Sequence, residues 1–297
     1  MSSLSSLGED ALIRLLTASA PSSENLIEGP GDDCAIVRRN EGWDTLLKTD
    51  AVVEGIHFTP DTKPHLIGRK ALARAVSDIA AMGGIPEHAL VTVLVHASRP
   101  VEVITDIYNG IKTLARKFGI SLAGGETSSL PSDGLALSIT LTGRVEHGRA
   151  WRRSTATPGD LLAVTGRLGG AFPSGRHLVF TPRVNWARSL QEHGPHPSAA
   201  MDLSDGLGTD LPRFAQASSC GFEIEPAHLP RHHGCDIPSA ICDGEDYELL
   251  LSFPPSALPD YRPGEHVPGL DFPLTVIGRM TAGAPGSLPS GWRHFIR

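Results

Sequence analysis

The sequence predicts a protein of the α/β (α+β) class with two domains, each a mixed sheet with packed helices. Strand-like and helix-like segments alternate along the chain. The 297 residues exceed the roughly 100–200 residues of one usual domain. The stretch 146–160, with Pro158-Gly159, is typical of a connection between domains. We therefore place the domains at residues 1–147 and 148–297.

Hydrophobic periodicity predicts the elements of the first domain in order. Leu12, Ile13, Leu15 and Leu16 favour a helix in the first 20 residues, opened by a capping box at residues 6–9. The later segments predicted are a strand at 45–48, a helix at 64–82 with its apolar side chains on one side, a strand at 89–95, a helix at 103–118, and strands at 120–123 and 135–141.

The second domain shows the same alternation of strands and helices. The segments predicted are a strand at 161–164, a helix at 185–192, a strand-to-helix turn at 201–211, and strands at 222–225, 247–253 and 274–277.

Composition excludes several classes of protein. The formal net charge is −7 with no basic block, which argues against a nucleic-acid surface. No apolar run reaches the roughly 18 residues of a membrane-spanning helix. The first 20 residues carry Glu9 and Asp10 and lack the basic start of a signal peptide. The four cysteines form no CxxC pair. We expect a cytoplasmic protein with no nucleic-acid or membrane partner.

Acidic residues recur beside glycines at the ends of predicted elements. The sites are Gly31-Asp32-Asp33, Asp50 at a strand end, Asp78 on a helix, Gly125-Glu126, Asp202 to Gly206, and Gly244-Glu245-Asp246. One such site is usually only a turn or a helix cap. Six together favour a shared site, because Mg²⁺ prefers hard oxygen ligands and glycines let backbone amides approach phosphate.

The sequence lacks the signature motifs of other nucleotide-binding sites and of hydrolases. The sequence has no GxxxxGK[ST] loop, no third glycine of a dinucleotide fingerprint, no protein-kinase motif set and no GxSxG elbow. A triphosphate would therefore be held through metal ions rather than in a lysine cradle.

Seven segments resemble, in order, those of thiamine-monophosphate kinases, which belong to the aminoimidazole ribonucleotide synthetase-like superfamily. They are GPGDDCAIV (29–37), KTDAVVEGIHF (48–58), RKALARAVSDIAAMGG (69–84), AGGETSS (123–129), RRSTATPGD (152–160), MDLSDGLGTDL (201–211) and DGEDYELL (243–250). The resemblance implies ATP-dependent phosphorylation of thiamine phosphate to thiamine diphosphate. It also implies a homodimer formed through the first domain's sheet, with ATP and several Mg²⁺ ions between the two domains.

The resemblance also implies roles for individual residues. Asp50, Asp202 and Glu126 are implied as catalytic. The metal ligands implied are Asp33, Thr49, Asp50, Asp78, Glu126, Asp202 and Asp205. The ATP contacts implied are Tyr108, Gly125, Glu126, Arg153 and Ser204. The substrate contacts implied are His57, Glu245 and Trp292.

The chain departs from the family pattern in three places. Glu126 stands where the family usually has Asp, and Lys48 where a Ser contributes to a metal. The Gly-Asp-Ser turn and following helix are shortened to 169–173. Lys48 could supply a fixed charge in place of one metal ion, or it could point into solvent. Two rival functions stay open: another ATP-dependent amide-activating enzyme of the superfamily, and a catalytically silent nucleotide-binding protein.

Overall fold

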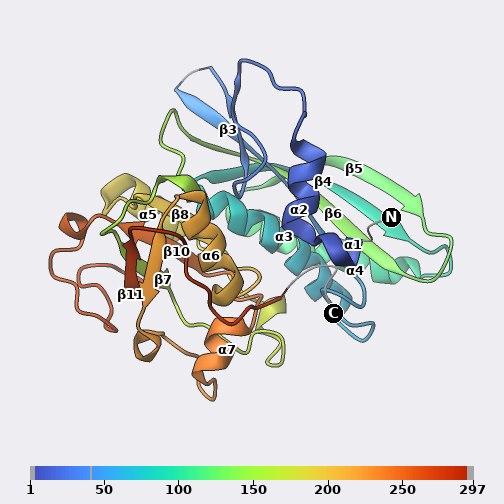
Figure 1. Cartoon of the computed structure of the whole chain (residues 1–297). Coiled ribbons are helices and arrows are strands. Elements are labelled where there is room, and N and C mark those ends of the chain that lie inside the picture. Colours follow the sequence, from blue (N-terminus) through green and yellow to red (C-terminus); the bar gives the residue numbers. More distant parts are fainter. Residues whose placement is uncertain (1–3, 41, 293–297) are drawn as a thin grey trace.

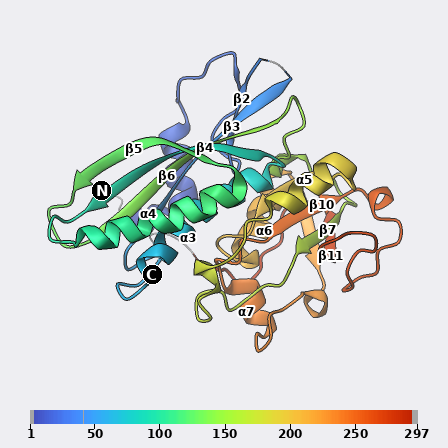
Figure 2. The same cartoon turned by 180° about the vertical axis from the view of Figure 1, so that it is seen from behind.

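The computed structural model describes residues 4–40 and 42–292, which form two sheets with helices packed between and around them (Figures 1 and 2). The first sheet has six strands in the order β1-β2-β3-β6-β4-β5. Its strands are β1 (Leu26–Glu28), β2 (Ala35–Arg38), β3 (Trp43–Val53), β4 (Ile85–Val95), β5 (Ser121–Ser129) and β6 (Leu135–Glu146). Only the β4–β5 pair is parallel, so this sheet is mixed.

The second sheet has five strands in the order β8-β10-β7-β11-β9, and all its pairs are antiparallel. Its strands are β7 (Leu161–Thr165), β8 (Ala199–Asp202), β9 (Gly221–Ile224), β10 (Leu249–Phe253) and β11 (Leu274–Thr281). The helices of this half are α5 (Val184–His193), α6 (Leu207–Ala217) and α7 (Ile237–Cys242). The two-sheet α/β architecture is confirmed, whereas the domain limits at residue 147 stay a prediction.

Helix α3 (Pro64–Ala81) lies at the centre of the molecule, against β3, β6 and α4 (Val101–Phe118) on one side and β8 and α5 on the other. The sequence predicted apolar residues on one side of this helix, but it is buried on nearly all sides. Strand β8 of the second sheet and α5 pack against the side of α3 that faces away from the first sheet. One continuous core therefore includes residues of both sheets, such as Ile139 of β6 and Leu249 of β10.

Strand β3 alternates its side chains between two faces, as its period of two requires. Leu46, Lys48 and Asp50 lie on the face that α3 and α4 cover, and Leu47 and Thr49 lie on the opposite, exposed face. The strand continues to Val53, so Asp50 does not end it as the sequence predicted. The alternation of side chains along β3 thus decides which predicted ligands share a face.

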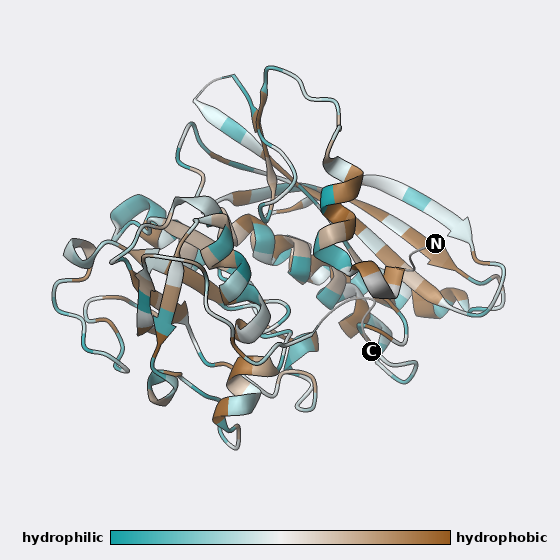
Figure 3. Cartoon of the chain, viewed as in Figure 1, coloured by the Kyte–Doolittle hydropathy of each residue, from teal (hydrophilic) through white to brown (hydrophobic). Residues whose placement is uncertain are grey.

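The N-terminal helix is interrupted. Helices α1 (Leu4–Leu7) and α2 (Glu9–Thr17) are separated by Gly8, which has a φ of 74°. The N-cap position of α2 is Gly8, a residue without a side chain, so the capping box predicted at residues 6–9 is wrong. Leu15 and Leu16 of α2 are exposed, and Figure 3 shows hydrophobic segments on this helix at the surface. Within residues 4–40 and 42–292, no helix combines the length and the apolar character needed to cross a bilayer.

Candidate active site

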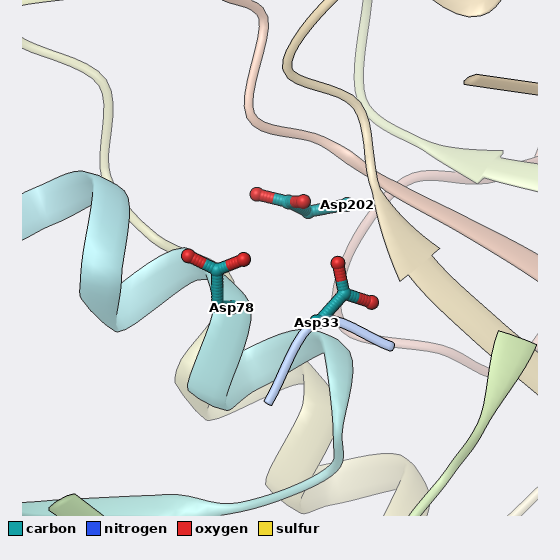
Figure 4. Close-up of side chains that lie close together, drawn as sticks. All are labelled: Asp33, Asp78 and Asp202. Carbon is teal, nitrogen blue, oxygen red and sulfur yellow. The ribbon is translucent and has the colours of Figure 1, made fainter. Parts of the chain in front are cut away.

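Three aspartates from distant parts of the chain meet between the two sheets. Asp33 lies in the turn before β2, Asp78 lies on α3, and Asp202 is the last residue of β8. One carboxylate oxygen from each lies within 4.8 Å of the others, and all three residues are buried. Figure 4 shows their carboxylates facing a common space. The cluster therefore presents hard oxygen atoms to one point, as a Mg²⁺ site requires.

Neighbouring side chains neutralise part of this charge. Lys48 Nζ lies 2.6 Å from Asp78 Oδ1, and the Arg153 guanidinium donates to Asp33 Oδ1. Ser77 Oγ donates to Asp202 Oδ2 at 2.7 Å. Asp33 Oδ2 is buried and has no hydrogen-bond partner among residues 4–40 and 42–292, which is unusual for a buried carboxylate oxygen. An additional cation at this oxygen would complete the set.

Burial and mutual repulsion shift the pKa values of the cluster. Burial and the charge of Asp33 raise the pKa of Asp202 to about 7. Burial also raises the pKa of Asp78 well above its ordinary value, against the opposing charge of Lys48. The pKa of adjacent Asp32 rises to about 6, through burial and then Asp33. At pH values below these pKa values, the carboxyls hold protons in the metal-free protein that a bound cation would displace.

A first pocket of about 260 Å³ opens onto the cluster. Of the predicted site residues it is lined by Asp50, Asp78, Arg153, Asp202, Ser204 and Asp205. It is also lined by Lys48, by Arg74, whose Nε lies 3.1 Å from Asp50 Oδ2, and by residues of α2 including Asp10. The pocket thus combines carboxylates with cationic groups, a lining suited to a triphosphate with its metal ions.

A second pocket of about 320 Å³ adjoins the first and shares four lining residues with it, namely Arg74, Ser204, Asp205 and Tyr247. It contains all three predicted substrate contacts, His57, Glu245 and Trp292. Ile56 and Phe172 contribute apolar walls. The shared residues mark the place where a ligand in one pocket meets a ligand in the other.

Two loops in the C-terminal half of the chain form the junction between the pockets. The buried carboxylate of Asp210 accepts from the backbone N–H groups of Ser204 and Asp205, which holds the turn after β8. Glu245 and Tyr247 have positive φ angles of 70° and 52°, and backbone hydrogen bonds to Ser204 and Leu203 hold them. Unfavourable backbone conformations of this kind occur where surrounding contacts fix a functional site.

Five predicted residues line neither pocket. One is Asp33, which is buried in the aspartate cluster, and the others are Thr49, Tyr108, Gly125 and Glu126. Thr49 is on the exposed face of β3, and Tyr108 packs against the core from α4. Gly125 and Glu126 are on the edge strand β5, three strands from β3 in the sheet order. A Cβ on Gly125 would lie 1.9 Å from the carbonyl oxygen of Val91, so strand packing alone requires this glycine. Their roles stay predictions.

Sequence reasoning missed several residues of the site, notably Lys70, Arg74 and Tyr247. Lys70 and Arg74 lie four residues apart on α3 and Asp78 follows after four more, so the three form one polar stripe along the helix. That spacing was a usable signal, since such a stripe on an otherwise apolar helix marks a buried polar site. Tyr247 gave no comparable signal, because its place depends on the fold of the 243–248 loop.

Comparisons with known proteins identify the family of the chain. The family model described as AIR synthase related protein, N-terminal domain, matches residues 31–145. The thiamine-monophosphate kinase of Rhodopirellula baltica is 36% identical over 249 residues, 76% of each chain. That of Salmonella typhimurium is 34% identical over 313 residues, 94% of this chain and 92% of the relative.

Solved structures also resemble this chain. AaThiL complexed with AMPPCP and TMP has a TM-score of 0.84 at 29% identity and covers 99% of both chains. HypE of E. coli, a hydrogenase maturation protein, has a TM-score of 0.65 at 22% identity, a likeness that shows the fold alone. The identity to the curated kinases extends over both halves of the chain. The chain therefore belongs to the thiamine-monophosphate kinase family.

Proposed function

We propose that the protein transfers the γ-phosphoryl group of ATP to thiamine phosphate, giving thiamine diphosphate and ADP. The observation that carries this proposal is the pair of adjoining pockets, one acidic and cationic, the other partly aromatic, with four residues in common. The activity for which the related kinases are named, and the AMPPCP and TMP bound in the related AaThiL structure, support the same two ligands.

The reaction needs positioning and charge neutralisation more than covalent chemistry. A phosphate oxygen of thiamine phosphate attacks the γ-phosphorus in line, and the bond from that phosphorus to the β-bridging oxygen breaks. Arg74 lines both pockets, so its guanidinium is placed to contact both anions. Arg153 and Lys48 add positive charge on the ATP side. The nucleophile is already ionised near neutral pH, so no general base is needed.

His57 has the role of an orienting donor in this scheme. The backbone N–H of Val53 donates to His57 Nδ1 at 3.1 Å. In the neutral ring the proton therefore resides on Nε2. His57 lines the second pocket, where Nε2–H can donate to the substrate.

Magnesium is part of the proposal, and Asp33, Asp78 and Asp202 are the residues best placed to hold it. The unpartnered oxygen of Asp33 and the all-oxygen donor set fit this ion. When bound, Mg²⁺ supplies neutralisation of the charge on the phosphates. Asp50 and Asp205 line the same pocket and complete the acidic wall. The predicted contributions of Thr49 and Glu126 have no support from the arrangement within one chain.

A homodimer through the first sheet belongs to the same proposal. Helices α3 and α4 cover one face of that sheet, and the other exposes Leu47, Val53 and Leu90. A second copy is the occupant that the family resemblance implies. In such a dimer, the exposed β5 residues Gly125 and Glu126 could contact the nucleotide bound by the other protomer, because β5 is an edge strand. A cytosolic location completes the proposal.

Thiamine phosphate is expected to be a far better acceptor than free thiamine, with kcat/KM at least about 10²-fold higher. Both compounds share the ring contacts, but only the monophosphate presents an ionised oxygen beside the γ-phosphate. ADP release and thiamine diphosphate formation, measured together with each acceptor, check this. ADP release without thiamine diphosphate would favour the amide-activating rival, and ATP binding without turnover would favour the silent binder.

Magnesium is expected to raise the melting temperature more at pH 8 than at pH 5.5. The raised pKa values of Asp32 and Asp202 mean that the metal-free folded protein binds more protons than the unfolded chain between about pH 4 and 7. Its stability therefore falls as pH rises through that window, and a cation that replaces the protons restores it.

Thermal melts with MgCl₂, and with KCl at matched ionic strength, measure this difference. An equal rise at both pH values would argue against magnesium at the aspartate cluster.

The double variant Lys48→Ser with Glu126→Asp is expected to bind more magnesium than the parent protein when both are titrated with MgCl₂. The ammonium group of Lys48 forms an ion pair with Asp78, so removing its charge leaves that carboxylate for a metal.

A further inference from the structure

Phe172 belongs to the shortened segment at 169–173, in which the chain departs from its family. Two backbone amides fix this segment: Gly169 N–H donates to Asp246 Oδ2 at 2.9 Å, and Gly170 N–H donates to Asp243 Oδ2 at 2.7 Å. Both acceptors flank Glu245 in the chain. The segment that carries Phe172 is therefore tied to the loop that carries a predicted substrate contact.

The ring of Phe172 stacks on the buried ring of His177 with a centroid separation of 4.3 Å and an interplanar angle of 19°. Lys70 Nζ also lies 5.9 Å from the centroid of the Phe172 ring. Phe172 is nevertheless 44% exposed, and it lines the second pocket together with Trp292. The face turned away from His177 is thus free to pack against a ligand ring.

The buried ammonium group of Lys70 connects three walls of this pocket. Its Nζ lies 2.5 Å from Glu245 Oε2, 2.6 Å from the carbonyl oxygen of His57 and 2.8 Å from His177 Nδ1. Because an ammonium group only donates, His177 Nδ1 accepts, and the imidazole is neutral. Burial and the charge of Lys70 lower the pKa of His177 to about 4, in agreement.

The charge of Lys70 also changes what Glu245 offers to a ligand. The carboxylate forms an ion pair with a cation that is almost completely buried, so the pair has no net charge. A cationic ring in the pocket would find little uncompensated negative charge on Glu245. Asp205, which also lines this pocket, is paired with Arg213 at 2.6 Å. The aromatic faces can still attract such a ring, because they bind cations through their π electrons.

We propose that Phe172 is a specificity residue for the cationic thiazolium ring of thiamine phosphate, with Lys70 and His177 as positioning residues that hold its ring. The inference rests on the proposed function, because that function supplies the ligand. It adds three residues to the site that the family resemblance did not include. It also assigns a role to the segment that distinguishes this chain.

Phe172→Ala is expected to weaken thiamine phosphate binding about tenfold, and Phe172→Leu nearly as much. The leucine keeps much of the apolar area but lacks the π face. KM for ATP stays unchanged, and kcat changes by less than about threefold. Val179→Ala is the matched control, since Val179 is half exposed shortly after this segment and lies outside the second pocket.

Calorimetric titration of each variant with two probes separates ring charge from ring shape. One probe is thiamine phosphate, and the other is the monophosphate of an uncharged isostere with carbon in place of the quaternary ring nitrogen. The parent protein is expected to prefer the cationic probe about tenfold, and Phe172→Leu to lose most of that preference. An undiminished preference in Phe172→Leu would overturn the proposal.

A double-mutant cycle tests the positioning role. Lys70→Met is expected to weaken thiamine phosphate binding, and adding it to Phe172→Ala should weaken binding by less than the product of the two single effects. Independent effects would overturn the role of Lys70. His177→Ala, which removes the stacked ring, replaces Lys70→Met in the cycle should the latter fail to fold.

Turnover tests the proposed function, whereas the affinity for thiamine phosphate tests the role of Phe172. Absence of thiamine diphosphate formation by the parent protein would refute the proposed function. An unchanged affinity of Phe172→Ala for thiamine phosphate would refute this inference alone.

Discussion

Asp202→Asn is expected to lower kcat by at least about 10²-fold while leaving the metal-free protein as stable as the parent. The carboxylate faces Asp33 and Asp78, so its loss removes one negative ligand from the cluster that neutralises the phosphates. The amide oxygen of asparagine can still accept from Ser77 Oγ, which donates to Asp202 in the parent. The folded structure therefore keeps this hydrogen bond while the reaction loses its metal ligand.

Stability and activity should even change in opposite directions. At pH 8, above the pKa of about 7, Asp202 is largely ionised beside other buried carboxylates. Removing this charge relieves repulsion, so the variant's melting temperature without magnesium should equal or exceed that of the parent. The increase on adding MgCl₂ should be smaller. Steady-state kinetics and thermal melts with and without MgCl₂ measure these quantities.

Asp50→Asn is expected to lower kcat about as much as Asp202→Asn does, since Asp50 lines the same pocket and pairs with Arg74. Asp106→Asn is the matched control, because Asp106 contacts His65 at the surface and lies outside both pockets. Near-parent kcat in both Asp50→Asn and Asp202→Asn at limiting magnesium would contradict the metal site. Loss of activity in Asp106→Asn would show that the assay responds to charge alone.

The sequence predicted the architecture well because hydrophobic spacing records local burial. Helix α4 is confirmed at Val101–Phe118 and α3 at Pro64–Ala81, each within about two residues of the prediction. The same spacing could not show that α3 is buried on several sides, because that depends on the second sheet packing against it. The short strands β1 and β2 were missed for a related reason. Their few residues carry too little alternation to stand out from turns.

Much of the site followed from motif order, but its geometry did not. Asp33, Asp78 and Asp202 were predicted as ligands, and the structure brings them together. The sequence allowed Lys48 either to replace a metal ion with its charge or to point into solvent. Only the fold shows that its ammonium group contacts Asp78. Glu126 was predicted with the same set, yet it lies on an edge strand outside the cluster. Which acids converge depends on strand order, and motif order along the chain does not encode it.

The contact between α3 and α4 holds the helix that carries much of the site. At their closest approach each helix has a glycine, Gly68 on α3 and Gly110 on α4. A Cβ on Gly68 would lie 1.9 Å from the carbonyl oxygen of Ile107, and one on Gly110 would lie 1.8 Å from that of His65. Both obstructing atoms belong to the backbone, so no side-chain rotation can make room.

Gly110→Ala is therefore expected to destabilise the protein by about 3 kcal/mol, even though alanine favours helix more than glycine does. The added methyl group must push the two helices apart, which loosens the packing of Ile107 and Ile111 on α4. Urea unfolding followed by circular dichroism measures the loss. Asn109→Ala, at the exposed neighbouring position, is the matched control and should leave stability unchanged or slightly higher. Since α3 carries Lys70, Arg74 and Asp78, the same shift should reduce kcat/KM for both substrates, whereas a variant of unchanged stability would show that the helices are not in backbone contact.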